Sequence, residues 1–332
     1  MSFHWTSRIL TLLLATASLH AKNDFSGLPN VPARTESGIA FSADFLYWYP
    51  SEQVNNIWAS VISVGFNRSA WGAPSFDFSW DPGFRVGAGY DLEYDQWDTA
   101  LYWTWFRTDN KQTIISASDA TISPEFDAAF LTGDFAQSLR GNWRLLLNMF
   151  DWELGRNYKV SKGLSLRPFL GVKGGSIRQS IHAHYSDLII HDIQTTHSGK
   201  ERLKNNFWGI GPSGGVNTKW TLRTFGSHLL NFFGDFSIAT MWGSWTCADV
   251  YQNTIPQTYS IGTKNSSVGA LMFRGFVGIG WDVNFNRSHL AAKLGFETQL
   301  WLNQLRISTL QVQRLHGDLS LQGLTFNCRY DY

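Results

Sequence analysis

The residues from Gly83 to Arg107 alternate between apolar and polar or small side chains with a period of two, which is the repeat of a β-strand. A very short turn near Asp95 and Gln96 divides the stretch into two arms of about ten residues each, and this predicts an antiparallel β-hairpin. A tilted strand needs about 9–11 residues to cross a bilayer. The hairpin is therefore long enough to belong to a transmembrane barrel.

The same alternation recurs along most of the chain. It is found in Ile39–Tyr49, Asn142–Arg156, Leu164–Ile177, Phe207–Trp220, Leu229–Trp242, Leu271–Phe285, Leu290–Leu302 and Leu324–Tyr332. In the second of these segments the apolar residues change faces, which predicts a β-bulge near Met149. Weaker candidates, each a further strand or a hairpin within a loop, are Ile57–Phe66, Gln112–Ser118, Ile177–Tyr185 and Val250–Ile261.

These segments predict an all-β fold, an antiparallel transmembrane β-barrel of the bacterial outer membrane. Inside hydrocarbon every backbone hydrogen bond must be made within the protein, so a sheet can cross only when it is closed. Composition agrees, because charged residues make up 16% of the chain against roughly 25% in soluble proteins, and aromatic residues reach 15%. Since bacterial barrels have an even number of strands, we expect about 12, within a range of 10 to 16.

The start of the chain predicts export. Residues 1–21 have a modest positive end at Arg8 and a short apolar core, as in a secretory signal peptide. Residues 22–37 resemble a leader, and residues 38–332 form the single barrel domain. The localisation that follows is the outer membrane, with lipid as a partner. The formal net charge of +1 favours no nucleic-acid partner.

The segment before Tyr332 alternates in the same way and ends on an aromatic residue. This ending resembles the signal that the outer-membrane barrel assembly machinery recognises, which makes that machinery an expected partner. The signal residues would be Phe326, Tyr330 and Tyr332. The pattern is compatible with both a monomer and a homo-oligomer.

The polar faces of the predicted strands supply the candidate pore lining. It contains five basic and seven acidic residues, so a mixed lining with weak ion selectivity is expected if they face a lumen. The alternative is that these side chains pair across the interior and stabilise the wall. They are Arg85, Asp91, Glu93, Asp98, Asp151, Glu153, Arg167, Lys173, Arg274, Asp282, Lys293 and Glu297.

Neither a cofactor nor a metal is expected. His182, His184, His191 and His197 lie close together in the sequence, but without accompanying cysteine or carboxylate spacing they are interpreted as part of a solvated loop. Cys247 and Cys328 could form one disulfide bridge, but Cys328 alternates with strand residues and is interpreted as a small apolar side chain on the lipid face.

Three stretches carry a resemblance to a known family: Trp80–Phe106, Phe150–Tyr158 and Ser165–Gly175. They are similar to the Legionella-type pore-forming outer-membrane proteins, which include the major-outer-membrane-protein-like porins of Chlamydia-like bacteria. The resemblance implies a porin that lets small hydrophilic solutes and ions diffuse passively. It carries no catalytic motif, so the protein is not expected to be an enzyme.

Other functions remain as alternatives. Lys111–Gly133, Ser186–Asn205 and Thr246–Ser267 could be surface loops of an adhesin or a structural envelope protein. A barrel hydrolase would need a Ser, His and acid set, and Ser288–His289 offers a start without a nucleophile motif. A secreted β-sandwich is the alternative fold, but the apolar faces are uniformly large and aromatic.

Overall fold

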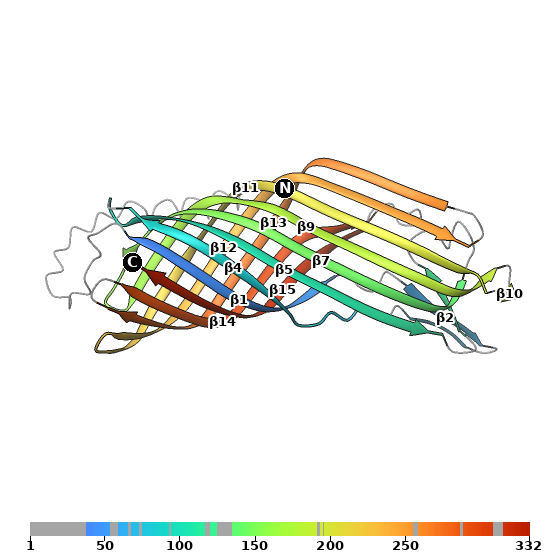
Figure 1. Ribbon diagram of the computed structural model, residues 1–332, viewed down its shortest axis with the longest axis horizontal. Helices are drawn as coiled ribbons and strands as arrows, with labels where there is room; N and C mark the ends of the chain where they lie inside the picture. The colour runs from blue at the N-terminus through green and yellow to red at the C-terminus, as the bar shows by residue number, and fades with distance from the viewer. Residues whose placement is uncertain are drawn as a thin grey trace, which may run out of the picture. The chain divides into compact units, whose positions relative to one another are not determined.

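Ten long antiparallel strands pair side by side in a ring in the computed structural model of the protein (Figure 1). The structure describes residues 38–332 except 54–58, 66–67, 73–74, 93, 117–119, 125–134, 191–192, 195, 255–257, 286–287 and 308–314. The predicted signal peptide, the leader, Glu93 and His191 lie outside the described residues. Among the described residues, no helix has the length and apolar character needed to span a bilayer.

Each barrel strand pairs with its neighbours by a continuous antiparallel register, and the pairing of β7 with β9 completes the ring. The barrel strands are β1 (Ile39–Glu52), β4 (Asp81–Asp91), β5 (Trp97–Ile115), β7 (Phe135–Arg156), β9 (Leu164–Ile190), β11 (Ser198–Phe225), β12 (His228–Asn253), β13 (Thr258–Asn284), β14 (His289–Ile307) and β15 (Leu315–Asp331). Outside the ring lie β2 (Ala59–Gly65), β3 (Arg68–Gly72), β6 (Ala120–Pro124), β8 (Tyr158–Lys159) and β10 (Ile193–Gln194).

The antiparallel barrel confirms the predicted fold class, and the ten ring strands that the described residues form lie at the lower limit of the predicted range of 10 to 16, below the expected value of about twelve. The difference arises because most of the weaker candidate segments lengthen existing strands. Residues 112–115 continue β5, residues 177–185 belong to β9 and residues 250–253 end β12. β2, which lies within the candidate segment 57–66, pairs with β3 and β6 instead of entering the ring.

The connections differ at the two ends of the barrel. At one end they are short, and the hairpin turn expected near Asp95 and Gln96 is confirmed by positive φ angles of 52° and 60° at these residues. Gly226, with φ 59°, makes the turn between β11 and β12 at the same end. The longer connections, such as the one between β1 and β4 to which β2 and β3 belong, lie at the other end. Short turns are periplasmic and long loops extracellular in barrels of this kind.

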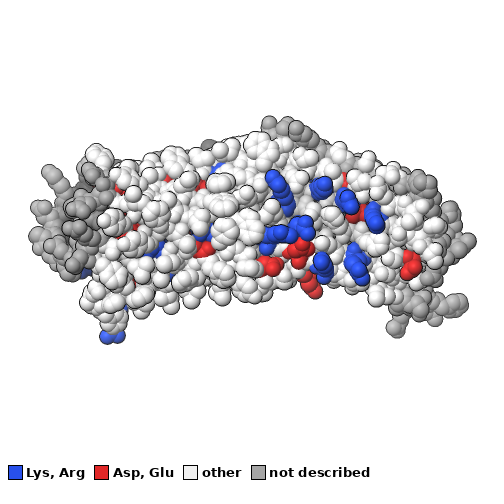
Figure 2. Space-filling view, in the orientation of Figure 1, with Lys and Arg blue, Asp and Glu red and all other residues white. Residues whose placement is uncertain are grey.

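The outward faces carry the apolar side chains that the alternation predicts. Exposed examples on successive strands are Phe41, Val86, Leu101, Phe150, Leu170, Trp208, Phe236, Phe273, Phe296 and Phe326. They form an apolar belt next to the short-turn end, where Figure 2 shows a surface almost without charge. Such a belt is what lipid hydrocarbon requires of a barrel wall.

The strands extend well beyond this belt. β9 has 27 residues and β11 has 28, against the roughly 9–11 that cross a bilayer. His182 and His184, interpreted from sequence as loop residues, lie within β9, so that interpretation was wrong. The sequence pattern failed there because beyond the bilayer both faces of a strand can carry polar side chains.

The bulge predicted near Met149 is absent, because β7 keeps an unbroken register with β5 through this point. Trp143, Leu145, Leu147 and Met149 all face inward and are almost fully buried. The apparent change of faces has a different cause: the inside of the barrel is itself apolar at this level.

Candidate functional site

The centre of the inward charge cluster near the short-turn end is Glu297 of β14, whose side chain is fully buried. It accepts a hydrogen bond of 2.7 Å from Nη2 of Arg85 on β4 and another of 2.7 Å from Nε of Arg274 on β13. Thr325 of β15 donates a third bond, of 3.0 Å. The same Arg85 binds Asp44 of β1 at 2.8 Å. Five strands are thus joined through one group of charges.

A second charge cluster surrounds Arg167 on β9. Its Nε lies 2.9 Å from the carboxylate of Asp98 on β5, and its Nη1 lies 2.9 Å from Glu153 on β7. Asn217 of β11 accepts a further bond of 2.8 Å from the guanidinium. Removing one partner of such an ion pair destabilises the fold, because the remaining charge is then left without compensation inside the protein. The cluster therefore holds four neighbouring strands at a fixed separation.

Three more inward pairs complete this part of the interior. Lys173 lies 2.5 Å from Asp151, Lys293 lies 3.2 Å from Asp235, and Lys219 contacts Asp282. Ten of the twelve candidate lining residues take part in one of these ion pairs. Asp91 also faces inward and is half-buried, whereas Glu93 lies outside the described residues.

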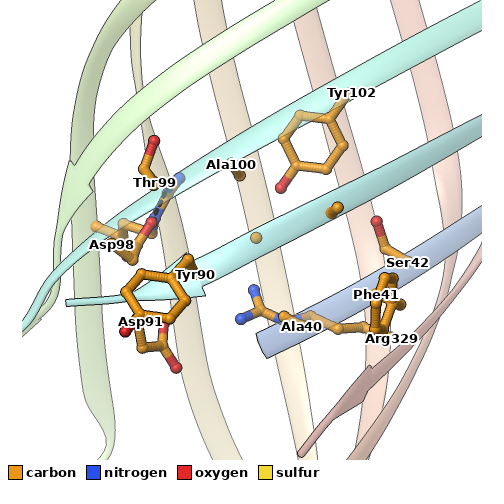
Figure 3. A pocket seen from close by; sticks show the side chains of 13 residues that line it. Ala40, Phe41, Ser42, Tyr90, Asp91, Asp98, Thr99, Ala100, Tyr102 and Arg329 are labelled. Atoms are coloured by element: carbon orange, nitrogen blue, oxygen red, sulfur yellow. Dashed lines mark hydrogen bonds and ion pairs between the residues drawn. The ribbon is translucent and has the colours of Figure 1, made fainter. Parts of the chain in front are cut away.

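A small cavity lies beside the Arg167 cluster, between β1, β4 and β5 (Figure 3). It has a volume of about 20 Å³, which is room for one water molecule. The polar ends of Tyr102 and Arg329 point toward this space, and Asp98 lies at its side (Figure 3). This part of the interior is polar enough to hold water.

Beyond the charge clusters, an apolar layer fills the barrel. Every barrel strand except β4 contributes to it, and we call it the inner apolar layer. Within it the rings of Phe207 and Trp245 are 4.2 Å apart and those of Trp48 and Phe106 are 5.5 Å apart. Its members are Leu46, Trp48, Phe106, Leu145, Leu147, Met149, Ile177, Phe207, Ala239, Met241, Trp245, Ala270, Met272, Trp301, Leu319 and Leu321.

A second apolar cluster closes the interior toward the long-loop end. Phe76 and Phe78, from the connection between β3 and β4, are buried against the inward-facing Trp143, with ring centroids at 5.7 and 5.3 Å. We call this group, which also includes Tyr185 and Tyr251, the mouth cluster. A chain segment outside the ring thus folds into the barrel mouth.

Sequence reasoning missed both apolar groups, and also the inward Asp44, Asp235 and Lys219. The two acids stand at alternating positions of predicted strands, so their parity could have placed them inside. The signal for the apolar layer was the run of large residues before Met149, whose opposite parity was read as a bulge. Among the described residues no group of three or more His, Cys, Asp and Glu side chains is arranged to hold a metal ion.

A closed antiparallel barrel with an apolar outer belt and ionised inward side chains defines a bacterial outer-membrane β-barrel protein. The chain belongs to the family described as the Legionella pneumophila major outer membrane protein precursor, whose model matches residues 30–332. This match confirms the resemblance seen in the sequence and places the protein in the outer membrane. A search of curated proteins finds no match.

Several solved barrels are similar in outline. The outer membrane protease OmpT from Escherichia coli has 7% identity and a TM-score of 0.40, covering 92% of this chain and 99% of its own. The toluene transporter TodX of P. putida has 10% identity and a TM-score of 0.27, with 89% of each chain covered. The anion-selective porin from Comamonas acidovorans has 11% identity and a TM-score of 0.12, covering 90% of this chain and 100% of its own. These scores are too low to carry a functional argument.

Proposed function

We propose that the protein is a gated pore for the passive diffusion of small hydrophilic solutes and ions across the outer membrane. The observation that carries the proposal is the change in the barrel interior along its axis. A region of ionised side chains lies near the short-turn end, and the inner apolar layer follows it toward the long-loop end. An interior that served only as packing would not need buried ions, which are costly to desolvate. Hydrophobic constrictions are a known way of closing a pore, since they exclude water.

In this proposal the described conformation is the closed state. The candidate lining residues then form a charged vestibule on the periplasmic side, with Arg85, Arg274 and Glu297 at its centre. Because basic and acidic side chains alternate there, the open pore is expected to select weakly between cations and anions.

The test is single-channel recording in a planar bilayer with Met272→Ser, which places a hydroxyl in the inner apolar layer. We expect a higher open probability than in the unchanged protein, because a polar group makes hydration of the layer easier. Phe273→Leu changes the adjacent lipid-facing residue and serves as the matched control. Channels absent from both proteins in a correctly folded sample would contradict a pore.

Absence of channels would favour the second candidate function, that of a structural envelope protein or adhesin that acts through its surface. Two features support this alternative: the filled interior and the barrel wall that extends past the apolar belt. Binding of whole cells with and without the protein to host cells would then be the relevant measurement.

We propose no enzymatic activity. His289, beside Ser288, donates a hydrogen bond from Nδ1 to Oδ2 of Asp331 at 2.6 Å, but Arg329 also donates to Asp331 at 2.7 Å. We interpret these contacts as ion pairs that stabilise the end of the barrel. Hydrolysis of lipid or peptide that a serine-reactive inhibitor blocks would contradict this view.

The assembly signal remains a proposal as well. Phe326, Tyr330 and Tyr332 are exposed on the outward side at the end of β15, the strand that closes on β1. An outward aromatic row on a closing strand is accessible to an assembly machinery before closure. We expect Tyr330→Ala with Tyr332→Ala to lower the amount of protein recovered in the outer-membrane fraction, while Tyr90→Ala, an exposed aromatic elsewhere on the wall, leaves it unchanged.

A further inference from the structure

The outer wall of the barrel carries a dense group of cations on four neighbouring strands, which we call the outer basic face. Figure 2 shows Lys and Arg gathered beyond the apolar belt. The group contains eight Lys or Arg side chains, all exposed, and His182 and His184 lie among them. Its members are Arg107 and Lys111 on β5, Arg140 and Arg144 on β7, Arg178 on β9, and Lys200, Arg202 and Lys204 on β11.

The strand register packs these cations into a continuous grid. Arg140 is opposite His184, which is in turn opposite Lys200. One step along, His182 is opposite Arg202. Neighbouring strands are about 4.8 Å apart and alternate residues of one strand about 6.6 Å apart. Cationic groups on this face are therefore separated by only about 5–7 Å at their backbones, close enough for several of them to bind one polyanionic group.

Most of this charge is not neutralised within the protein. On the outward positions of these strand segments the only acid is Asp109, which binds Arg144 at 2.8 Å and Arg107 at 3.7 Å. In the part of the chain that the structure describes, Arg178, Arg202 and Lys204 form no ion pair. Crowding like charges without counter-charges is unfavourable unless an external anion joins them.

The position of the face indicates where that anion comes from. On β11, the outward residues after Lys204 are Asn206, then Trp208 and Ile210, which are exposed members of the apolar belt. On β5, the outward residue before Arg107 is the belt residue Trp105. The basic face thus begins at the level where lipid tails end, on the long-loop side of the barrel. That level is occupied by the headgroups of the outer leaflet.

We propose that the outer basic face binds a membrane lipid whose headgroup carries clustered phosphates, such as the phosphorylated glycolipid of a bacterial outer leaflet. Arg guanidinium groups bind phosphate oxygens in bidentate fashion, and Lys adds further charge. The exposed Trp208 and Ile210 contact the acyl chains of the same lipid directly below. The headgroup and the acyl chains of the lipid both bind to the wall formed by β5, β7, β9 and β11, which fixes the position of the lipid around the barrel.

The experiment measures binding of diphosphorylated lipid A to the purified full-length protein in phosphatidylcholine nanodiscs. The test variant is Arg178→Gln with Arg202→Gln and Lys204→Gln. Each cation near a membrane surface is worth roughly fivefold in binding, so we expect the variant to bind about 100-fold more weakly. Correct folding of each variant is checked by heat-modifiable mobility on a gel.

The matched control removes the same number of positive charges at the short-turn end, where Lys159, Lys162 and Arg223 are also exposed. Lys159→Gln with Lys162→Gln and Arg223→Gln should bind lipid A as the unchanged protein does. A second variant, Arg178→Lys with Arg202→Lys and Lys204→Arg, keeps the charge and should retain affinity within about threefold.

Three results would overturn the proposal. The first is equal loss of affinity in the test and control triple variants, which would mean that net charge alone attracts the lipid. The second is wild-type affinity for lipid A no higher than for a dephosphorylated form. The third is displacement of lipid A by an equal concentration of inorganic pyrophosphate, which would identify a soluble anion as the ligand.

Discussion

At the scale of single residues, Glu297 shows how the interior depends on complete pairing. Four side chains donate to its carboxylate, those of Arg85, Arg274, Gln299 and Thr325. Replacing the carboxylate by an amide leaves Arg274 facing a neutral partner inside the barrel, while Arg85 keeps its ion pair with Asp44. Removing one partner of a buried ion pair costs about 3–5 kcal/mol, because the remaining charge is buried without compensation.

We therefore expect Glu297→Gln to lower the free energy of unfolding by about 3 kcal/mol. The measurement is urea unfolding of the protein refolded into lipid vesicles, followed by Trp fluorescence. Thr298→Ala changes the next residue, on the lipid-facing side, and should alter the free energy of unfolding by less than about 0.5 kcal/mol. Equal stability of Glu297→Gln and the unchanged protein would show that the cluster contributes no net stability.

At the scale of elements, β12 contains a place where only glycine fits. Gly243 marks the shift in register between β12 and β13, and an added Cβ there would lie 1.8 Å from the carbonyl oxygen of Trp208 on β11. We expect Gly243→Ala to push β11 and β12 apart and to lower the free energy of unfolding by about 1–3 kcal/mol. Gly269→Ala on β13 is the matched control, since its Cβ would have no atom within 4 Å. Equal effects of the two substitutions in the same urea unfolding assay would contradict this account.

The outward-facing residues of each strand were predictable, because the bilayer requires apolar side chains on the outer face of every barrel strand. The alternation of Phe84, Val86 and Tyr90 with Arg85 and Asp91 gave the correct faces for β4 before any pairing was known. The contacts of the inward-facing residues were less predictable. Arg85 and Glu297 are 212 residues apart, so their contact depends on closure of the ring and not on local pattern.

The strand number could not be derived from the pattern for a related reason. Alternation indicates that a segment is extended, but it does not indicate where one strand ends and the next begins. The segment 177–185 continues β9 past the bilayer, while β2 leaves the ring altogether. Both look alike in sequence, because beyond the lipid no apolar belt distinguishes a wall strand from a loop hairpin.

At the scale of the whole barrel, two apolar groups, the inner apolar layer and the mouth cluster, lie between the inward charge clusters and the long-loop end. Cys247 faces inward on β12 between Trp245 of the inner apolar layer and Tyr251 of the mouth cluster. Its thiol can therefore report access through the mouth. We expect Phe76→Ala with Phe78→Ala to speed its reaction with a membrane-impermeant maleimide by at least roughly tenfold, since the mouth cluster loses its cover.

The labelling experiment is made in a Cys328→Ser background, so that only Cys247 can react. Ser75→Ala, which alters an exposed residue beside Phe76, controls for changes in the connecting segment. Labelling at the same rate in the double variant and its parent would show that Phe76 and Phe78 do not limit access.

The closure of β1 on β15 also has a consequence for how the barrel folds. Ala40 pairs with Asp331 and Glu52 with Leu319, so the joining strands are separated in sequence by the rest of the ring. Contacts between such distant residues form late, because the entropy of closing a long loop must be overcome first. Until then β1 and β15 each present an unpaired edge to any other strand nearby. The slowest step of folding is therefore expected to be this closure, and the partly folded chain is vulnerable to aggregation until it is complete.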